Sequence, residues 1–161
     1  MKYLLFLGAP LFALDQLTKW LVRKEIRYGS EVPVIPGFFS LVHASNTGAA
    51  FSMLTGNNLF FIVLAVGALA FCTILLIRHH RTKAEQKRLT TLAQISIALL
   101  ISGILGNLVD RLIRGAVTDF LYFYVQQYSW PSFNVADSCI CIAAGLLILG
   151  SLQRTDKAKT T

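Results

Sequence analysis

Residues 103–137, GILGNLVDRLIRGAVTDFLYFYVQQYSWPSFNVAD, decide how the chain is interpreted, because they hold three of its eight acidic residues between two long apolar segments. Asp110 lies near the end of the first segment, Asp137 near the start of the second, and Asp119 in the connection between them. Carboxylates at the edge of a bilayer are energetically costly. We therefore expect these aspartates to have a specific structural or functional role.

The composition indicates a membrane protein of one domain. Hydrophobic residues make up 55% of the 161 residues and charged residues only 14%, whereas soluble domains carry roughly 25% charged residues. The mean hydropathy is +0.60. The net charge is +7, but the basic residues lie in short runs beside apolar segments, which favours membrane orientation over nucleic-acid binding.

Four apolar segments are long enough to cross a bilayer as helices, namely residues 3–22, 59–77, 91–113 and 135–153. The first could also be a signal peptide, but Leu11 lies at the −3 position before Ala13 and apolar character resumes up to Val22, so we interpret it as a retained helix. The predicted fold is thus an all-α integral membrane domain over residues 1–161. We expect a small extended or β segment after the first helix, with extended chain and a turn at 32–37 and a strand at 38–45.

The distribution of Lys and Arg predicts the orientation. Nine of them fall at the two termini and in the loop 78–90, and five fall on the opposite side. Since positive charge is enriched in cytoplasmic loops, we expect both termini in the cytoplasm and the loops 23–58 and 114–134 outside. The aromatic residues at 120–130 are typical of an interfacial belt, which would hold Asp119 near the headgroups. The tail from Arg154 onward is polar, and we expect it to be frayed.

Polar residues at helical spacing gather at one membrane depth. Asp15 and Lys19 are four residues apart on one face of the first helix. They could form a structural ion pair, or a pair that orients a substrate. Asn46 and Gly48 begin a small-residue stretch that allows close backbone approach, although a helix cap or a turn would explain it equally well. Two polar faces complete the pattern, formed by Gly103, Asn107, Asp110, Arg111 and Arg114 on the third helix and by Asn134, Asp137, Ser138 and Cys141 on the fourth.

Two of the aspartates could hydrolyse an amide without Ser, Cys or a metal. One carboxylate activates a water and the other protonates the leaving nitrogen, since two close carboxylates share a proton. Asp137, in the first turn of a helix, is the expected ionised member. Taken singly, Asp137 is equally well explained as a helix cap and Asp110 as the partner of an Arg.

Five blocks of this sequence resemble the lipoprotein signal peptidase family, also called signal peptidase II. They are DQLTK at 15–19, NTGAAF at 46–51, GNLVDR at 106–111, VTDF at 117–120 and FNVAD at 133–137. The resemblance implies a bacterial inner-membrane aspartic peptidase with its site at the periplasmic face. Such an enzyme removes the signal peptide from diacylglyceryl-modified prolipoproteins by cutting just before the lipidated Cys.

The same resemblance implies the site residues. Asp119 and Asp137 would form the catalytic dyad. The substrate would be surrounded by Asn46, Gly48, Asn107, Arg111 and Asn134, with support from Asp15, Lys19 and Asp110. It also implies no metal or other cofactor, contact with membrane lipids, inhibition by cyclic peptides of the globomycin type, and a monomer. Asp110 is the rival for the dyad, but Arg111 and Asn107 beside it would hold it ionised, so we favour Asp119.

Two other classes of function remain open from the sequence. The aspartates could be structural or ion-coupling in a transporter subunit or a lipid-binding scaffold, or they could belong to an enzyme that acts on lipids. No internal repeat is seen, and the carboxylates gather at one surface instead of along a pathway, which weighs against a transporter.

Overall fold

Four long helices dominate the computed structural model, which describes residues 2–48, 56–81 and 89–159, with side chains as far as residue 152. They are α1 (Ala9–Glu25), which continues a π-helical turn η1 (Leu4–Gly8), α2 (Asn58–Arg81), α3 (Thr91–Arg114) and α4 (Val135–Lys159). The stretches Leu4–Glu25, Asn58–Arg81, Thr91–Arg114 and Val135–Leu152 are long and apolar enough to cross a membrane. The prediction of four helices long and apolar enough to span a bilayer is confirmed.

The helices extend further than the apolar segments that predicted them. Helix α1 continues to Glu25, α2 to Arg81 and α4 to Lys159, where we had expected a frayed tail from Arg154. The polar residues that follow each apolar run include good helix formers such as Glu, Lys and Arg, and no Pro or Gly interrupts them. Hydropathy therefore marks the membrane segment and not the helix end. Residues 82–88 of the expected loop lie outside the described residues.

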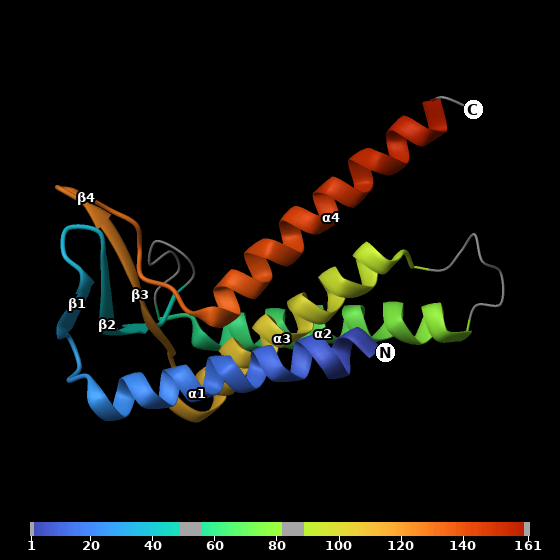
Figure 1. Cartoon of the computed structure of the whole chain (residues 1–161). Helices are drawn as coiled ribbons and strands as arrows, with labels where there is room; N and C mark the ends of the chain where they lie inside the picture. Colours follow the sequence, from blue (N-terminus) through green and yellow to red (C-terminus); the bar gives the residue numbers. More distant parts are fainter. Residues whose placement is uncertain (1, 49–55, 82–88, 160–161) are drawn as a thin grey trace.

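A small antiparallel sheet lies at one end of the helices, with strand order β1-β2-β3-β4 (Figure 1). Its strands are β1 (Glu31–Ile35), β2 (Phe39–Asn46), β3 (Val117–Val125) and β4 (Tyr128–Ser129). The predicted extended segment and strand after the first helix are confirmed as β1 and β2. Pro36 and Gly37 form the turn between them, in which Gly37 has φ 79° and Phe38 N donates to Ile35 O over 3.0 Å. Those positions suit a type II turn.

The expectation that residues 114–134 form only a loop was wrong. Strand β3 runs through this connection and pairs with β2, so that Asp119 lies opposite Ala44 and Thr118 opposite Ser45. Its sequence, VTDFLYFYV, is rich in the β-branched and aromatic residues that favour strands. We had interpreted the aromatic residues only as an interfacial belt. In the structure, Phe123 also stacks on Phe39, with ring centroids 4.7 Å apart.

Helix α3 is the most buried of the four spanning helices and contacts the other three. Two glycines on it admit neighbouring helices closely: a Cβ at Gly103 would collide with Ala136 O of α4, and one at Gly106 would lie 2.5 Å from Asp15 Oδ2 of α1. Both chain termini lie at the end of the molecule away from the sheet, and α4 diverges from the other helices towards its C-terminus (Figure 1). The sheet therefore meets the helices where α1 and α3 end and α4 begins.

Candidate active site

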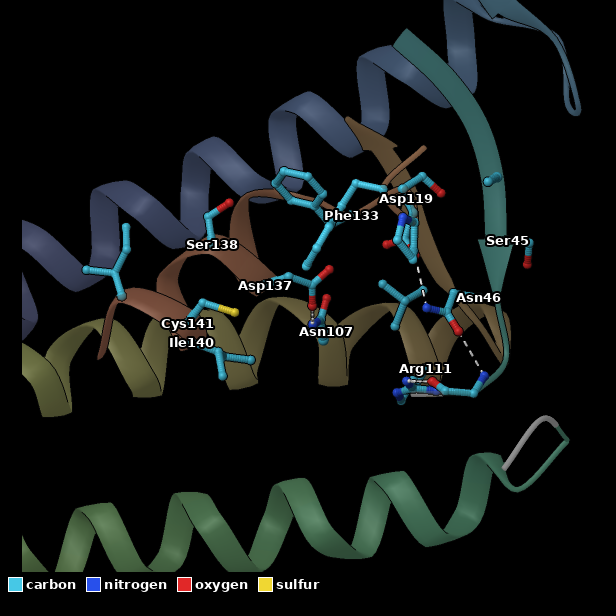
Figure 2. Close-up of a pocket in the computed structure, with 17 residues that line it drawn as sticks. Ser45, Asn46, Asn107, Arg111, Asp119, Phe133, Asp137, Ser138, Ile140 and Cys141 are labelled. Carbon is cyan, nitrogen blue, oxygen red and sulfur yellow. Dashed lines mark hydrogen bonds between the residues drawn. The ribbon is translucent and has the colours of Figure 1, made fainter. Parts of the chain in front are cut away.

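Asp119 on β3 and Asp137 on α4 open into the same cavity of about 790 Å³ (Figure 2). The polar part of its lining includes Asn46, Gly48, Asn107, Arg111 and Ser138, and the apolar part includes Trp130, Phe133, Ile140, Cys141 and Ile142. The structure thus brings together residues separated by nearly 100 positions. Of the two polar helix faces predicted from the sequence, the cavity is lined by Asn107 and Arg111 on α3 and by Asp137, Ser138 and Cys141 on α4. The other members, Gly103, Asp110, Arg114 and Asn134, do not line it.

Asp119 is almost completely buried, with 2% of its surface exposed. Its Oδ1 accepts from Asn134 Nδ2 at 2.8 Å, and its Oδ2 accepts from Asn46 Nδ2 at 3.0 Å. Burial, and the negative charge of Asp137, raise the pKa of Asp119 to about 7, although the two amide donors act in the opposite direction. Asp119 is therefore suited to carry a proton near neutral pH.

Asp137 belongs to the cap that begins α4. Asn134 precedes the helix, and its Oδ1 accepts from Asp137 N at 2.9 Å, while Asp137 Oδ2 accepts from Asn134 N at 3.2 Å. This reciprocal pair is a capping box with Asn and Asp in place of Ser and Glu. Asn107 Nδ2 donates to the other oxygen, Asp137 Oδ1, at 2.7 Å. Each oxygen of the Asp137 carboxylate thus accepts one hydrogen bond.

The orientation of two asparagine amides follows from their partners. Gly48 N donates to Asn46 Oδ1 at 2.9 Å, and Asp137 N donates to Asn134 Oδ1. A backbone N–H can only donate, so each amide must turn its NH₂ group towards Asp119. Asn134 is completely buried between the two aspartates and touches both, although it does not line the cavity.

A cluster of charged residues, Asp15, Lys19 and Asp110, lies behind the cavity and does not line it. Lys19 is fully buried, and its Nζ lies 2.9 Å from Asp15 Oδ2 and 3.3 Å from Asp110 Oδ2. The i,i+4 pair expected between Asp15 and Lys19 is present. Asp15 also accepts from Ala136 N at 2.9 Å, so that it holds the first turn of α4 against α1.

The pairing of Asp110 with an Arg is confirmed, but Arg111 was the wrong partner. We had paired it with Arg111, but its ion-pair partners in the described part of the chain are Lys19, Arg23 and Arg114. Residues adjacent on a helix point about 100° apart, so Arg111 faces elsewhere. Thr118 N donates to Asp110 Oδ2 at 3.1 Å, which ties α3 to the start of β3.

Arg111 reaches the segment after β2. Its Nη2 donates to Gly48 O at 2.7 Å, and its guanidinium lies over the Phe61 ring, 4.5 Å from the centroid. Its other terminal nitrogen, Nη1, is buried and has no hydrogen-bond partner among the residues that the structure describes. Because Arg111 lines the cavity, a substrate is a natural acceptor for that group. Residues 49–51 of the predicted NTGAAF block lie outside the described residues.

The sequence analysis missed Arg23 as a member of this network. Its Nη1 donates to Thr118 Oγ1 at 3.0 Å and lies 3.5 Å from Asp110 Oδ1. Arg23 follows Lys19 by four residues, as Lys19 follows Asp15, and this continuous spacing could have revealed it. Among the described residues, no group of three or more His, Cys, Asp or Glu side chains is arranged to hold a metal ion.

Comparison with known proteins gives a consistent result. A family model described as signal peptidase (SPase) II matches residues 7–153. A protein from Symbiobacterium thermophilum named lipoprotein signal peptidase is 44% identical to this chain, over 84% of each chain. A protein of the same name from Ralstonia nicotianae is 46% identical, over 92% of this chain and 83% of the other. A lipoprotein signal peptidase from Neisseria meningitidis serogroup C is 41% identical, over 96% of this chain and 92% of the other.

Solved structures show the same fold. A bacterial membrane enzyme determined by the in meso method at 2.3 Å resolution aligns with a TM-score of 0.86 at 29% identity, over 98% of this chain and 92% of that one. A second, determined at 1.9 Å resolution, aligns with a TM-score of 0.80 over 94% of each chain.

Proposed function

The chain belongs to the signal peptidase II family, and from that membership we propose that it is an aspartic endopeptidase that cuts diacylglyceryl-modified prolipoproteins just before the lipidated Cys. Its family makes it a peptidase that removes signal peptides from prolipoproteins, and its four apolar helices make it a multi-pass membrane protein. One observation carries the aspartic mechanism: Asp119 and Asp137 open into one cavity, where burial and the charge of Asp137 raise the pKa of Asp119 to about 7.

The two carboxylates have separate roles in this mechanism. An ionised Asp137 takes a proton from a water as the water oxygen attacks the scissile carbonyl carbon. Asp119, protonated near neutral pH, donates a hydrogen bond to the carbonyl oxygen as negative charge develops there. The C–N bond then breaks as a proton from the pair passes to the leaving nitrogen. Asn46, Asn107 and Asn134 hold the carboxylates, and Arg111, which lines the cavity, binds a substrate carbonyl.

The lining of the cavity fits the proposed substrate. Trp130, Phe133, Ile140 and Ile142 give it an apolar side that suits a signal-peptide helix and a lipid chain, and the polar side holds the dyad. Cyclic peptides of the globomycin type, which carry both a backbone and an apolar tail, would occupy the same space. Asp15, Lys19 and Asp110 support the site from behind and do not touch the substrate.

We place the site at the outer face of the bacterial inner membrane, with both termini in the cytoplasm. Nine Lys and Arg residues against five support this orientation. The sheet, whose strand β3 carries Asp119, and the start of α4, which carries Asp137, lie at the opposite end of the helices from the two termini (Figure 1).

A cleavage assay in detergent with a chelator tests the proposal. The purified protein should cut a diacylglyceryl-modified precursor just before the modified Cys, and the unmodified precursor serves as the matched control. A globomycin-type peptide should inhibit the reaction. Cleavage that stops when the chelator is added would contradict the aspartic mechanism, and equal cleavage of both precursors would contradict the proposed substrate.

A further inference from the structure

Lys19 has an unusual environment for a lysine inside a membrane helix. None of its side chain is exposed, and its ammonium group meets three acceptors: Asp15 Oδ2 at 2.9 Å, Asp110 Oδ2 at 3.3 Å and Asn107 Oδ1 at 2.9 Å. An ammonium has three N–H groups and cannot accept a hydrogen bond. Lys19 therefore donates a hydrogen bond to Asn107 and forms ion pairs with two carboxylates.

The hydrogen bond from Lys19 orients the amide of Asn107, together with a longer bond from Asn134 Nδ2 to the same oxygen at 3.3 Å. Since Lys19 only donates, Asn107 must turn its carbonyl oxygen towards Lys19 and its NH₂ group towards Asp137 Oδ1, 2.7 Å away. A turned amide would place its NH₂ against the ammonium and its oxygen against the carboxylate. Both of those contacts are repulsive, so Lys19 excludes that orientation.

We propose that Lys19 is a positioning residue, which acts through Asn107 to keep a hydrogen-bond donor on Asp137. This inference rests on the proposed function, because it assigns the role of base to Asp137. Without Lys19, only the longer bond from Asn134 Nδ2, at 3.3 Å, holds Asn107 Oδ1, and the amide turns its oxygen towards Asp137 more readily. A carboxyl that faces an acceptor keeps its proton and cannot take one from water.

A purely structural role for Lys19 makes a different prediction. In that case Lys19 only balances the buried charges of Asp15 and Asp110, and removing a cation together with one anion should restore both the fold and the activity. If Lys19 positions Asn107, the balanced variant should fold but should remain slow. The charged groups around Asp137 are Lys19 and Asp15 on α1, Arg111 on α3 and Asp119 on β3.

The experiment compares Lys19→Met with two charge-balanced variants, Lys19→Met/Asp15→Asn and Lys19→Met/Asp110→Asn. Asp15→Asn and Asp110→Asn alone measure the effect of each second change. We expect Lys19→Met to lose thermal stability and at least one balanced variant to regain it. In that variant kcat should be about 10- to 100-fold lower than in its Asp→Asn control, the range for a lost hydrogen bond to a charged group. KM should change little, because substrate binding does not use Lys19.

The pH profile gives the readout that charge balance alone does not predict. The acidic limb of kcat should move to higher pH by about one unit, since one unit corresponds to about 1.4 kcal/mol and the lost bond is of that size. A folded balanced variant with the kcat and pH profile of its control would overturn the inference. So would failure of both balanced variants to fold, which would make Lys19 an indispensable structural cation. The unmodified enzyme is assayed on the same lipid-modified precursor, and its failure to cleave would instead contradict the proposed function.

Discussion

Asn134 and Asp137 bond each other reciprocally at the start of α4, the Asn134 side chain accepting from Asp137 N at 2.9 Å and the Asp137 side chain accepting from Asn134 N at 3.2 Å. The bonds that begin the helix are therefore the bonds that hold a proposed catalytic carboxylate. An Asn at position 137 would keep the shape of this side chain and one oxygen that can accept from Asn134 N. Substitutions at this position can thus separate chemistry from folding.

The first prediction concerns the dyad. Asp119→Asn and Asp137→Asn should each abolish turnover while leaving the fold and the binding of a substrate-mimicking peptide intact, because each removes a proton-transfer group and preserves its shape. General acid and base groups contribute about 10²- to 10⁴-fold each, and groups that act as a unit are not additive. The double variant should therefore be little slower than either single variant in a purified cleavage assay.

Asp110→Asn is the matched comparison for the dyad variants. Asp110 is buried, but it lies behind the cavity and holds Lys19, Arg23 and Arg114. Its replacement should lower the melting temperature alongside any loss of rate. A well-folded but inactive Asp110→Asn, together with an active Asp119→Asn, would assign the dyad to Asp110 and Asp137.

The second prediction concerns the pH dependence of stability. The pKa of Asp119 is about 7 in the folded protein, against 3.8 for an unperturbed Asp, so the folded state binds the proton more tightly. The tighter proton binding stabilises the folded state fully below pH 4. This stabilisation, on the order of 4 kcal/mol, is lost as the pH rises through about 7. Asp119→Asn removes the ionisable group and therefore the cost of ionising it above pH 7. The variant should melt at a higher temperature than the unmodified protein at pH 8 and should show no such advantage at pH 4. Melting curves in detergent across this range measure it, and equal melting temperatures at pH 8 would contradict the raised pKa.

The third prediction concerns Asp15. Asp15→Asn keeps an oxygen that can accept from Ala136 N but removes a charge partner of Lys19, whose remaining carboxylate is Asp110. Removing one partner of a fully buried ion pair costs about 3–5 kcal/mol, and less where a second partner remains. We expect a lower yield and melting temperature with part of the activity retained. Normal stability combined with complete loss of turnover would place Asp15 in the catalytic group.

The fourth prediction concerns the approach of α3 to α1. A Cβ at Gly106 would lie 2.5 Å from Asp15 Oδ2 and 3.0 Å from the Ala136 side chain. Gly106→Ala should therefore destabilise the protein by about 1–3 kcal/mol, as overpacking does. Gly67 on α2 has no atom within 4 Å of a Cβ, so Gly67→Ala is the control and should be neutral or slightly stabilising. Equal thermal shifts for the two variants would disagree with the close packing at Gly106.

The fifth prediction concerns orientation. Reporter fusions in the loop 78–90 and at the C-terminus should report the cytoplasm, and fusions near positions 40 and 126 should report the outside. The basis is the excess of Lys and Arg on the side of the termini. An outside signal from the loop 78–90 would reverse the orientation and move the proposed site to the cytoplasmic face.

The sequence alone determined the features that depend on local composition and spacing. Length and hydropathy defined four spanning helices, because a bilayer requires about 20 apolar residues for each. The i,i+4 spacing of Asp15 and Lys19 predicted their ion pair, since such residues lie on one face of a helix. Pro36 and Gly37 predicted a turn by their own backbone preferences.

Only the tertiary structure decided which of these residues meet. Strand β3 was missed because its pairing with β2 joins segments more than 70 residues apart, and its aromatic residues suit an interfacial belt as well as a strand. The partners of Asp110 were mistaken because adjacency along a helix separates two side chains in space, whereas Lys19 and Arg23 approach from another helix. The unequal surroundings of Asp119 and Asp137 arise where β3, α3 and α4 converge, and burial and long-range hydrogen bonds of that kind leave no local pattern in the chain.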